Sequence, residues 1–394
     1  MKKGWEYKEL GEVCDFRSGF AFKSNKFTEV GEPIIRISDI QNEEIGDSNL
    51  VFFDPKSYKE DLSKYLIYPD DILIAMSGGT TGKLGINNSK KTYYLNQRVG
   101  VFRENKKYLN HRYLFHYLHT KSEESLRIAA GAAQPNLSTT QIKSFEIPVP
   151  PLTEQQTIVS YLDAAFAKID AMKANAEKAL GEAKALFQAS LKDLLTPKEG
   201  WKEKKFGNIC KFVRGPFGGS LKKECFKDSG YAVYEQQNAI YNKFTFRYYI
   251  DEEKYKSLIR FKVNSGDLIM SCSGTIGKVA IIPEHSQEGI INQALLKLTP
   301  NKEIEAHFLK YLMESNYFKE VINANIEGVA IKNIVSVAVL KEINLYIPKV
   351  TEQQSIVATL DTLKSKVDRL QANFEKIVAE CGALKQAILR EVFE

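Results

Sequence analysis

A glycine-containing loop is the first segment whose residue types could do chemistry. Residues 77–83 have the sequence SGGTTGK, and the phosphate-binding loop of nucleoside triphosphatases is GxxxxGK followed by Ser or Thr. The match fails because Ser77 takes the place of the first glycine and Leu84 follows Lys83. The corresponding segment at 272–279 fails at both positions as well. We therefore expect no nucleotide hydrolysis, and interpret the loop as a surface that meets a sugar-phosphate backbone.

Other catalytic patterns are absent or weak. The chain has no GxGxxG dinucleotide fingerprint and no Asn- or Asp-Pro-Pro-aromatic sequence. Asp70 with Glu104 and Lys106 loosely resembles a metal-dependent nuclease core, but the second half has no matching Glu-x-Lys, so chance explains it better. His116 and His119 could share one helix face, yet their tyrosine and leucine neighbours favour a packing face over a metal site. The sequence predicts a non-catalytic protein with no metal or cofactor of its own.

An internal duplication organises the chain. Gly19 recurs as Gly215, and Asn96-Gln97 recurs as Asn292-Gln293 at the same offset. Further along, Thr-Glu-Gln-Gln at 153–156 recurs at 351–354. Chance does not keep such a constant register, so we expect two similar globular modules.

Each module begins with short β-rich runs, which in the first half lie at 33–37, 71–75, 99–103 and 145–149. A helix is expected at 109–118, with its counterpart at 304–313. Prolines then end the module, because the residue before a proline is kept out of the helical region. The expected fold class is α+β, with a first module at 1–150, its long helix at 151–196, a second module at 197–347 and a second long helix at 348–394.

The long helices are the clearest local prediction. Thr153 with Gln156, and Thr351 with Gln354, fit a capping box at the helix start. A four-three apolar repeat follows, which predicts a coiled-coil seam; the alternative is a helix packed on its own module. The seam residues are expected to be Ile158, Leu162, Ala165, Ile169, Met172, Ala176, Ala179, Ala183 and Leu186, then Ile356, Leu360, Leu363, Val367, Leu370, Phe374, Ile377, Cys381 and Leu384.

Polar side chains suited to phosphates and base edges remain after the search for catalysis. Arg and Lys can contact guanine, and Asn or Gln can pair with adenine. Each of them is individually more typical of an ordinary surface, or of a turn in the case of Asn96 and Asn292. The candidates in the first module are Arg17, Ser18, Lys23, Arg36, Ser77, Thr80, Thr81, Lys83, Lys90, Lys91, Gln97 and Arg98. Those in the second are Arg214, Lys222, Lys223, Gln236, Gln237, Asn238, Ser273, Thr275, Lys278, Asn292 and Gln293.

Composition agrees with a polyanion as partner. The net charge is +6, and the excess of basic residues lies in the two modules, not in the helices. No apolar run approaches the roughly 20 residues of a membrane helix, and the first residues do not form a secretory signal. Five cysteines without a C-x-x-C pair indicate reduced thiols in a cytoplasmic protein.

The chain resembles the specificity (S) subunit of type I restriction-modification systems over its full length. The resemblance depends on the tandem module-helix order and on the PPLTEQQ segment at 150–156 with its echo PKVTEQQ at 348–354. The helix ends at 186–189 and 384–387 and the segment GAAQPNLS at 131–138 add to it. The second module departs from the family at 328–333, so that any role of Gln134 is not duplicated.

The resemblance implies that each module is a target recognition domain for one half of a split, asymmetric site in double-stranded DNA. It also implies that the two helices pair as an antiparallel coiled coil and dock two modification methyltransferase subunits. Those subunits would carry S-adenosylmethionine, and restriction subunits with ATP and Mg²⁺ would join them. Two alternatives stay open: a self-contained nuclease or methyltransferase, and a coiled-coil adaptor or inhibitor of a restriction-modification system that does not recognise sequence.

Overall fold

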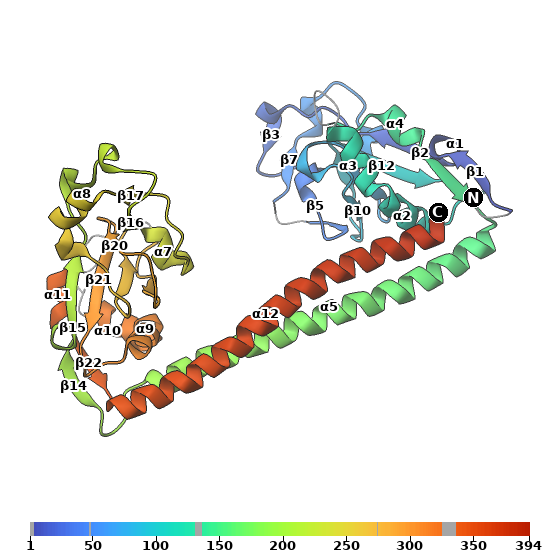
Figure 1. Ribbon diagram of the computed structural model, residues 1–394. Helices are drawn as coiled ribbons and strands as arrows, with labels where there is room; N and C mark the ends of the chain where they lie inside the picture. Colours follow the sequence, from blue (N-terminus) through green and yellow to red (C-terminus); the bar gives the residue numbers. More distant parts are fainter. Residues whose placement is uncertain (1–3, 47–48, 131–135, 274, 325–335) are drawn as a thin grey trace. The chain divides into compact units, whose positions relative to one another are not determined.

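The structure is a computed structural model that describes residues 4–46, 49–130, 136–273, 275–324 and 336–394. It divides into two compact units: unit 1 is Met1–Ala176 with Phe374–Glu394, and unit 2 is Glu177–Asn373. Each unit therefore holds one module and a part of both long helices (Figure 1). The segment at 328–333 and most of that at 131–138, including Gln134, lie outside the described residues.

Unit 1 is an α+β module. Among its described residues it forms a two-stranded sheet β1-β13, a six-stranded sheet β2-β12-β9-β10-β6-β5 and a five-stranded sheet β3-β7-β4-β11-β8. The strands are β1 (Glu6–Glu9), β2 (Cys14–Ser18), β3 (Phe27–Thr28), β4 (Glu32–Ile35), β5 (Ile40–Gln41), β6 (Glu44–Ile45), β7 (Val51–Phe53), β8 (Leu66–Ile67), β9 (Ile72–Ala75), β10 (Leu84–Ile86), β11 (Tyr93–Leu95), β12 (Val99–Glu104) and β13 (Glu146–Val149). The helices are α1 (Leu10–Val13), α2 (His111–Thr120), α3 (Ser122–Ala130) and α4 (Thr139–Lys143).

Unit 2 repeats this plan with fewer strands. Its described residues form the sheets β14-β22, β15-β21-β18-β19 and β17-β16-β20. The strands are β14 (Lys202–Lys205), β15 (Cys210–Arg214), β16 (Tyr231–Tyr234), β17 (Tyr249–Ile250), β18 (Leu268–Ser271), β19 (Val279–Ile281), β20 (Gly289–Ile291), β21 (Leu295–Pro300) and β22 (Asn344–Ile347). The helices are α6 (Phe206–Ile209), α7 (Gln236–Tyr241), α8 (Glu252–Ser257), α9 (Ala306–Glu314), α10 (Asn316–Ala324) and α11 (Val337–Glu342).

The α+β class and the duplicated plan expected from the sequence are confirmed. The four predicted strand segments of the first half appear as β4, β9, β12 and β13, and the predicted helices appear as α2 and α9. In both units a three- or five-stranded sheet contains a parallel pair, β4 with β11 and β16 with β20, and in unit 1 β6 also pairs with β10 in parallel. Their neighbours in the same sheet are antiparallel. Because parallel strands end at the same sheet edge, residues that follow them in sequence are brought together there.

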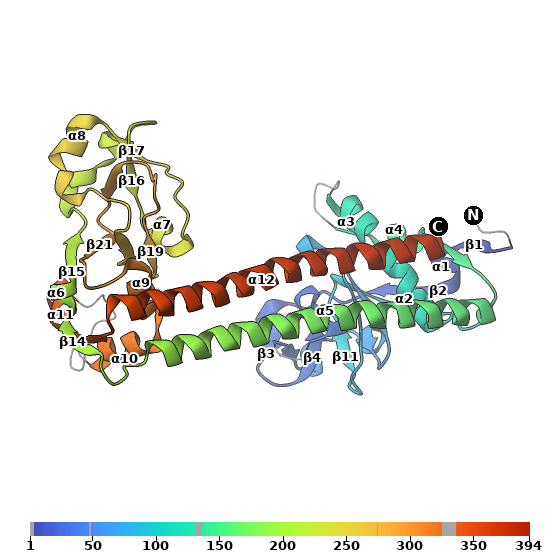
Figure 2. The same cartoon turned by 60° about the horizontal axis from the view of Figure 1, so that its bottom comes forward.

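The long helices α5 (Leu152–Leu195) and α12 (Val350–Phe393) pack together in opposite directions within each unit (Figures 1 and 2). In unit 1 the Lys385 Nζ lies 2.7 Å from an Asp170 carboxylate oxygen. In unit 2 the Lys184 Nζ donates a 2.8 Å hydrogen bond to Gln371. No helix among the described residues is long and apolar enough to cross a membrane.

The predicted apolar seam is only partly correct. Leu162, Ile169 and Leu360 are buried, but Met172, Ala179, Leu186 and Leu384 are exposed. The buried positions on the second half of α5 are instead Leu180, Phe187, Leu191 and Leu195. The reason is that the end of α5 packs on the module of unit 2, where Phe187 meets Tyr311 edge to face. A helix that packs on a module as well as on another helix buries a stripe that follows 3.6 residues per turn instead of 3.5.

The end of α12 packs on the module of unit 1 in the same way. Leu389 and Phe393 are buried in the core of this module. The Phe393 ring lies 5.1 Å from the ring of Tyr113 and 5.8 Å from that of Tyr117, measured between centroids. The hydrophobic core of unit 1 is therefore built from two segments that are far apart in the sequence.

A buried glutamine fastens the start of each long helix to its module. The Gln155 amide nitrogen donates to the backbone oxygens of Tyr108 at 2.7 Å and Pro150 at 2.8 Å. Its Oε1 accepts from the backbone N–H of Asn110 at 2.7 Å. Gln353 makes the equivalent bonds to Glu303, Pro348 and Glu305. Both side chains are completely buried, and each glutamine satisfies three backbone groups at its junction, one of them in a fully buried contact.

The glutamine contacts correct the predicted capping boxes. The helices begin at Leu152 and Val350, so that Thr153 and Thr351 already lie in the first turn. The carbonyls of Pro151 and Lys349 accept the first helical hydrogen bonds. The first glutamine of each Gln-Gln pair, and not the second, therefore makes the decisive contact. A tryptophan supports each junction, since Trp5 and Trp201 donate from their indole nitrogens to Glu154 and Glu352.

We predict that Gln155→Leu lowers the stability of the full chain by about 2–3 kcal/mol, because it leaves one buried and two partly buried backbone groups without partners. Chemical denaturation measures the change. Gln156→Leu is the matched control: Gln156 is exposed and accepts one hydrogen bond from Asn110, which water can replace, so less than about 1 kcal/mol should be lost. Equal losses in the two variants would contradict the assignment.

Candidate nucleic-acid interface

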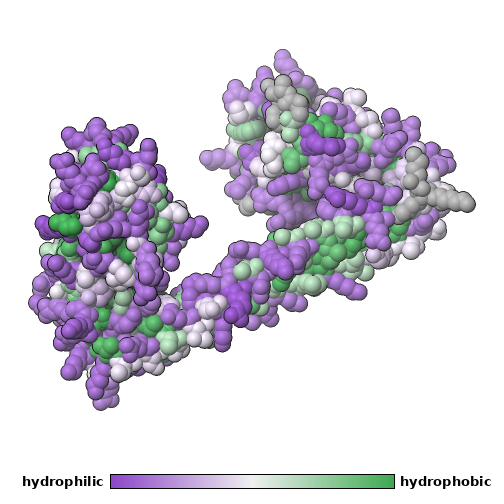
Figure 3. Space-filling view, in the orientation of Figure 1, coloured by the Kyte–Doolittle hydropathy of each residue, from purple (hydrophilic) through white to green (hydrophobic). Residues whose placement is uncertain are grey.

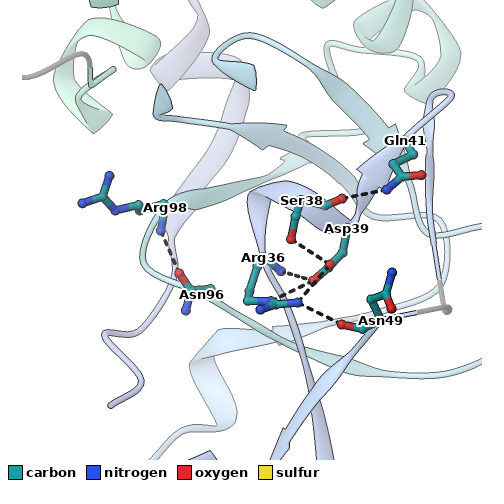
Figure 4. A network of polar contacts seen from close by, with 7 residues as sticks. All are labelled: Arg36, Ser38, Asp39, Gln41, Asn49, Asn96 and Arg98. Carbon is teal, nitrogen blue, oxygen red and sulfur yellow. Dashed lines mark hydrogen bonds and ion pairs between the residues drawn. The ribbon is translucent and has the colours of Figure 1, made fainter. Parts of the chain in front are cut away.

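The candidate interface of unit 1 lies at the edge where the parallel strands β4 and β11 end. The Asn96 N–H donates to the Ile35 carbonyl at 3.1 Å and so joins the two strand ends. Arg36, Ser38 and Asp39 follow β4, and Asn96 and Arg98 follow β11 (Figure 4). Two loops that are 60 residues apart in sequence thus form one surface, because parallel pairing requires it.

Arg36 is held inside this surface. Its guanidinium donates to both Asp39 carboxylate oxygens and, from Nη2, to the Asn49 carbonyl at 2.9 Å (Figure 4). Asp39 is buried and also accepts from the Arg36 backbone N–H at 2.9 Å and from the Ser38 hydroxyl. The Arg36 side chain therefore fixes the turn after β4 through Nε and Nη2, whereas its Nη1 has no protein partner among the described residues.

Arg98 is differently placed. It is exposed, projects from the turn away from the Arg36–Asp39 pair (Figure 4), and its Nη1 donates to the Ser77 hydroxyl at 3.2 Å. The backbone carbonyl of Arg98 also accepts from the Met76 N–H. These contacts connect the turn after β11 to the glycine-containing loop at 77–83. Within the described residues, the remaining guanidinium donors of Arg98 have no protein partner.

The glycine-containing loop is a tight turn that exposes a lysine. Ser77 and Thr81 are buried, and the Thr81 hydroxyl donates to the Gly78 carbonyl at 2.7 Å. Gly82 has φ +83°, and a Cβ there would collide with the Ser122 carbonyl oxygen. The Lys83 side chain is exposed. Ser77 and Thr81 were candidates for DNA contacts, but both are buried and stabilise the loop instead. Lys83 remains available for a phosphate.

Unit 2 places a different set of side chains on the same edge. Glu235, Gln236 and Gln237 follow β16, and Asn292 with Gln293 follows β20. The Asn292 N–H donates to the Tyr234 carbonyl at 3.0 Å, as Asn96 does in unit 1. Gln236 holds the loop after β18 at both ends of its amide: Nε2 donates to the Ser273 carbonyl, and Oε1 accepts from the Ser273 hydroxyl at 2.8 Å.

The turn after β16 contains a carboxylate where unit 1 has an arginine. Glu235 accepts two hydrogen bonds from Arg247, at 2.9 and 3.0 Å. Its carboxylate raises the pKa of Arg247 through these bonds. Asn238 is buried, accepts from the Glu235 N–H and donates to the carbonyls of Lys243 and Thr245. Asn238 therefore has no free group for a base, contrary to prediction, because its amide holds the turn.

Asn96 and Asn292 act as turn residues. Their side-chain oxygens accept from the backbone N–H of Arg98 and Ala294, at 3.4 and 3.0 Å. A glycine lies against each turn: a Cβ at Gly19 would collide with the Leu95 and Asn96 carbonyls, and one at Gly215 with the Asn292 carbonyl. Because these two glycines have no side chain, their backbone can lie directly against the asparagine turn in each unit. Gln97 and Gln293, one residue further, are exposed.

The other predicted residues are spread over the modules. Lys90 and Lys91 precede β11 and so lie at the opposite end of this strand from Arg98. Arg17 is exposed but paired with Asp15 at 2.7 Å, and Ser18 ends β2. Thr80 belongs to the loop at 77–83, and Thr275 and Lys278 are exposed in the loop after β18. Lys23, Lys222 and Lys223 are exposed in the segments after β2 and β15, and Arg214 ends β15.

Sequence reasoning missed Arg247 and Asp39. Arg247 is 12 residues from Glu235, and nothing in the local sequence marks the pair. Asp39 had a signal: in both halves an acidic or amide residue follows three positions after the first residue beyond the strand, as Arg36-x-x-Asp39 and Glu235-x-x-Asn238. This spacing is typical of a capping contact at the start of a helical turn, and both contacts are present.

A second polar cluster lies away from this edge, in unit 1. A cavity of about 530 Å³ is lined by residues of α2, α5 and α12. There the His116 Nε2 and the Arg112 guanidinium both contact one oxygen of Asp163, at 2.8 and 2.6 Å. The predicted packing face of α2 is confirmed, since Tyr113, Tyr117 and His116 are buried. In unit 2 the donor of the equivalent contact is neutral, since the Tyr311 hydroxyl donates to Asp361 at 2.6 Å.

Comparisons with known proteins agree with the duplicated plan. The family model described as "Type I restriction modification DNA specificity domain" matches residues 2–180 and again 198–377. The specificity subunit of the type I restriction enzyme EcoBI of Escherichia coli is 24% identical, over 99% of this chain and 85% of that protein. The putative type I restriction enzyme MjaX specificity subunit of Methanocaldococcus jannaschii is 25% identical, over 96% of this chain and 91% of that protein.

Two solved structures share the fold. One, from work on assembly and conformational transition of the type I R-M system, has a TM-score of 0.76 at 19% identity and covers 100% of this chain and 98% of that one. The HsdS subunit of Thermoanaerobacter tengcongensis has a TM-score of 0.57 at 19% identity, over 99% and 97% of the two chains.

The glycine that supports the unit 2 turn is open to a direct test. Gly215→Ala should lower the stability by about 1–3 kcal/mol, because the added methyl group forces the backbone at Asn292 to move. Gly181→Ala is the control: no atom lies within 4 Å of a Cβ at this helical position, so this change should leave the stability equal or raise it by up to about 1 kcal/mol. Denaturation midpoints of the two variants give the comparison, and a neutral Gly215→Ala would contradict the close contact.

The Asp163 cluster predicts a pH dependence of stability. Burial lowers the pKa of His116 below its usual 6.5. For Asp163, burial raises the pKa, but the hydrogen bonds from Arg112 and His116 outweigh it and lower the pKa overall. Groups whose pKa is lowered by folding stabilise the fold above their unfolded pKa and lose this contribution as the pH falls. Through His116 the stability of the full chain should therefore fall from pH 7 to pH 5, whereas the contribution of Asp163 is lost only near and below its usual pKa of 3.8.

His116→Gln tests the histidine contribution, because it keeps a hydrogen-bond donor and removes the titrating group. The denaturation midpoint of this variant should fall less between pH 7 and pH 5 than that of the parent chain. Tyr311→Phe, which removes the equivalent hydrogen bond in unit 2, should lower the midpoint equally at both pH values. The same pH dependence in His116→Gln and the parent chain would refute the contribution of His116.

Proposed function

This chain belongs to the type I restriction-modification DNA specificity family, and we propose that it recognises a bipartite, asymmetric site in double-stranded DNA, one part by each module. The family model matches once in each half of the chain. The relatives that match over nearly the full length carry the name of specificity subunits. Specificity subunits provide the recognition of DNA in these enzymes. This chain is therefore non-catalytic, and catalysis belongs to other subunits.

The observation that carries the proposal is the contrast at the two strand edges. The scaffold is the same: parallel strands, an asparagine turn, a supporting glycine and a serine loop in each unit. The exposed or half-exposed polar groups differ, with Arg98 in unit 1 against Gln236 and Gln237 in unit 2, whereas Gln97 and Gln293 are the same residue at equivalent positions. A constant frame with different hydrogen-bonding groups suits two different base sequences.

Basic residues on the loops beside these edges suit the DNA backbone. Lys83 of unit 1 and Lys278 of unit 2 are exposed on matching loops. Phosphate contacts hold a protein on the duplex without carrying sequence information. We therefore assign Lys83 and Lys278 to phosphates, and the amide and guanidinium groups to base edges.

The long helices are proposed to dock methyltransferase subunits. An apolar patch covers α12 in unit 1 (Figure 3). About half of the Leu384 side chain is exposed, and Val378, Ala379 and Ala383 are exposed on the same helix. Exposed apolar clusters of this kind mark protein interfaces. S-adenosylmethionine would be bound by these subunits, and ATP and Mg²⁺ by restriction subunits that join the complex.

Selection of DNA from a random duplex library by the purified full chain tests the proposal. Two short conserved blocks separated by a constant number of unspecified base pairs are expected. Lys83→Ala should weaken binding to all sequences to a similar extent and reduce the salt dependence of the affinity by about one phosphate contact. An adaptor or inhibitor without sequence recognition would instead bind weakly and enrich no sequence, and this outcome would overturn the proposal.

A further inference from the structure

We propose that two positions at each strand edge decide which base a module prefers. One of the two positions carries a polar side chain, which is held by a serine of the neighbouring loop, Ser77 in unit 1 and Ser273 in unit 2. The positions are Ile37 and Arg98 in unit 1, and Gln236 and Ala294 in unit 2. The proposal rests on the DNA recognition proposed above and specifies its chemistry: a guanine contact for module 1 and an adenine contact for module 2.

The pairs correspond because the scaffold is duplicated. Ile37 and Gln236 are each the second residue after the parallel strand, behind Arg36 and Glu235. Arg98 and Ala294 each donate their backbone N–H to the asparagine two residues earlier. Each also accepts, through its carbonyl, from the residue just before the loop serine, Met76 or Cys272. The four residues are therefore equivalent in pairs by contacts as well as by sequence order.

The serine is contacted from different turns in the two units. In unit 1 the contact comes from the turn after β11, where the Arg98 Nη1 donates to Ser77. The other position is apolar there, and Ile37 lies beside Gly78 of the same loop. In unit 2 the contact comes from the turn after β16, where Gln236 binds Ser273. The other position is Ala294, whose methyl group cannot reach a partner. Each module thus has one polar side chain at this place and fills the second position with an apolar one.

The chemistry of the two side chains separates their targets. The Arg98 guanidinium has only donors, and those not used on Ser77 suit the O6 and N7 acceptors of guanine. Gln236 uses one N–H and one Oε1 lone pair on Ser273. The remaining N–H and lone pair point to opposite sides of the amide, so only one of them can contact a given base. The free Oε1 lone pair suits the N6 donor of adenine in the major groove, where guanine has the O6 acceptor. In both modules the serine restricts the side chain before DNA arrives, which reduces the entropy lost on binding.

Reciprocal exchange in the full chain tests the assignment. Ile37→Gln with Arg98→Ala gives module 1 the pair found in module 2, and Gln236→Ile with Ala294→Arg does the reverse. Selection from a random duplex library should show guanine replaced by adenine at one position of one block for the first variant, and adenine replaced by guanine in the other block for the second. The unaltered block in each variant serves as an internal control.

Single variants test the same assignment if glutamine at the half-buried position of Ile37 prevents folding. Arg98→Ala removes an exposed side chain and should reduce the discrimination for guanine at one position about tenfold, with the second block unchanged. Gln236→Ala should do the same for adenine in the other block. A changed base preference in the block of the other module would overturn the inference. A uniform loss of affinity for all sequences, as expected of Lys83→Ala, would overturn it as well.

The same experiment separates this inference from the proposed function. A parent chain that enriches a bipartite sequence, together with single variants whose blocks stay unchanged, refutes the role of this pair and leaves bipartite recognition intact. A parent chain that enriches no sequence refutes both.

Discussion

The fully buried glutamine at the start of each long helix is the contact on which the arrangement of each unit depends. Gln155 and Gln353 bind only backbone groups, so the junction does not depend on which side chains occur in the neighbouring loop. An unsatisfied amide in this place would be costly, and an apolar residue would leave three backbone groups unpaired. Each module is thereby fixed to its helix by contacts that are independent of the polar groups at its strand edge.

Backbone contacts also separate the frame from the variable surface within a module. The asparagine turns, the supporting glycines and the parallel strand ends are the same in both units. An ion pair stabilises each turn, but the signs are exchanged. The first residue after the parallel strand is the cation in unit 1, where Arg36 pairs with Asp39, and the anion in unit 2, where Glu235 pairs with Arg247. A half-buried ion pair costs desolvation unless it is well hydrogen bonded, and both pairs are. The charge at this point can therefore be reversed while the fold is kept.

The sequence alone was sufficient for the fold class, the duplication and the long helices, because repeats and periodicity are local signals. It was insufficient where a side chain meets a distant one. Arg36 is one example: Asp39 and Asn49 hold its Nε and Nη2 in the turn after β4, so only Nη1 is left for the predicted contact with DNA. Ser273 and Gln236 are 37 residues apart and meet only in the folded chain. The seam was misplaced at Met172 and Leu384 because the helix ends pack on modules, which a heptad pattern does not contain. Which of the remaining candidates contact DNA is still a prediction.

The burial of Leu389 and Phe393 in the module of unit 1 has a consequence for biosynthesis. The module emerges first from the ribosome, but two of its core side chains come from the last turns of α12, after the whole of unit 2. At about 5–20 residues per second, the apolar surface around Tyr113 and Tyr117 stays uncovered for roughly 12–48 s. During that interval the nascent chain offers a hydrophobic surface that a chaperone can protect, and unit 2 can complete its own core before unit 1 does.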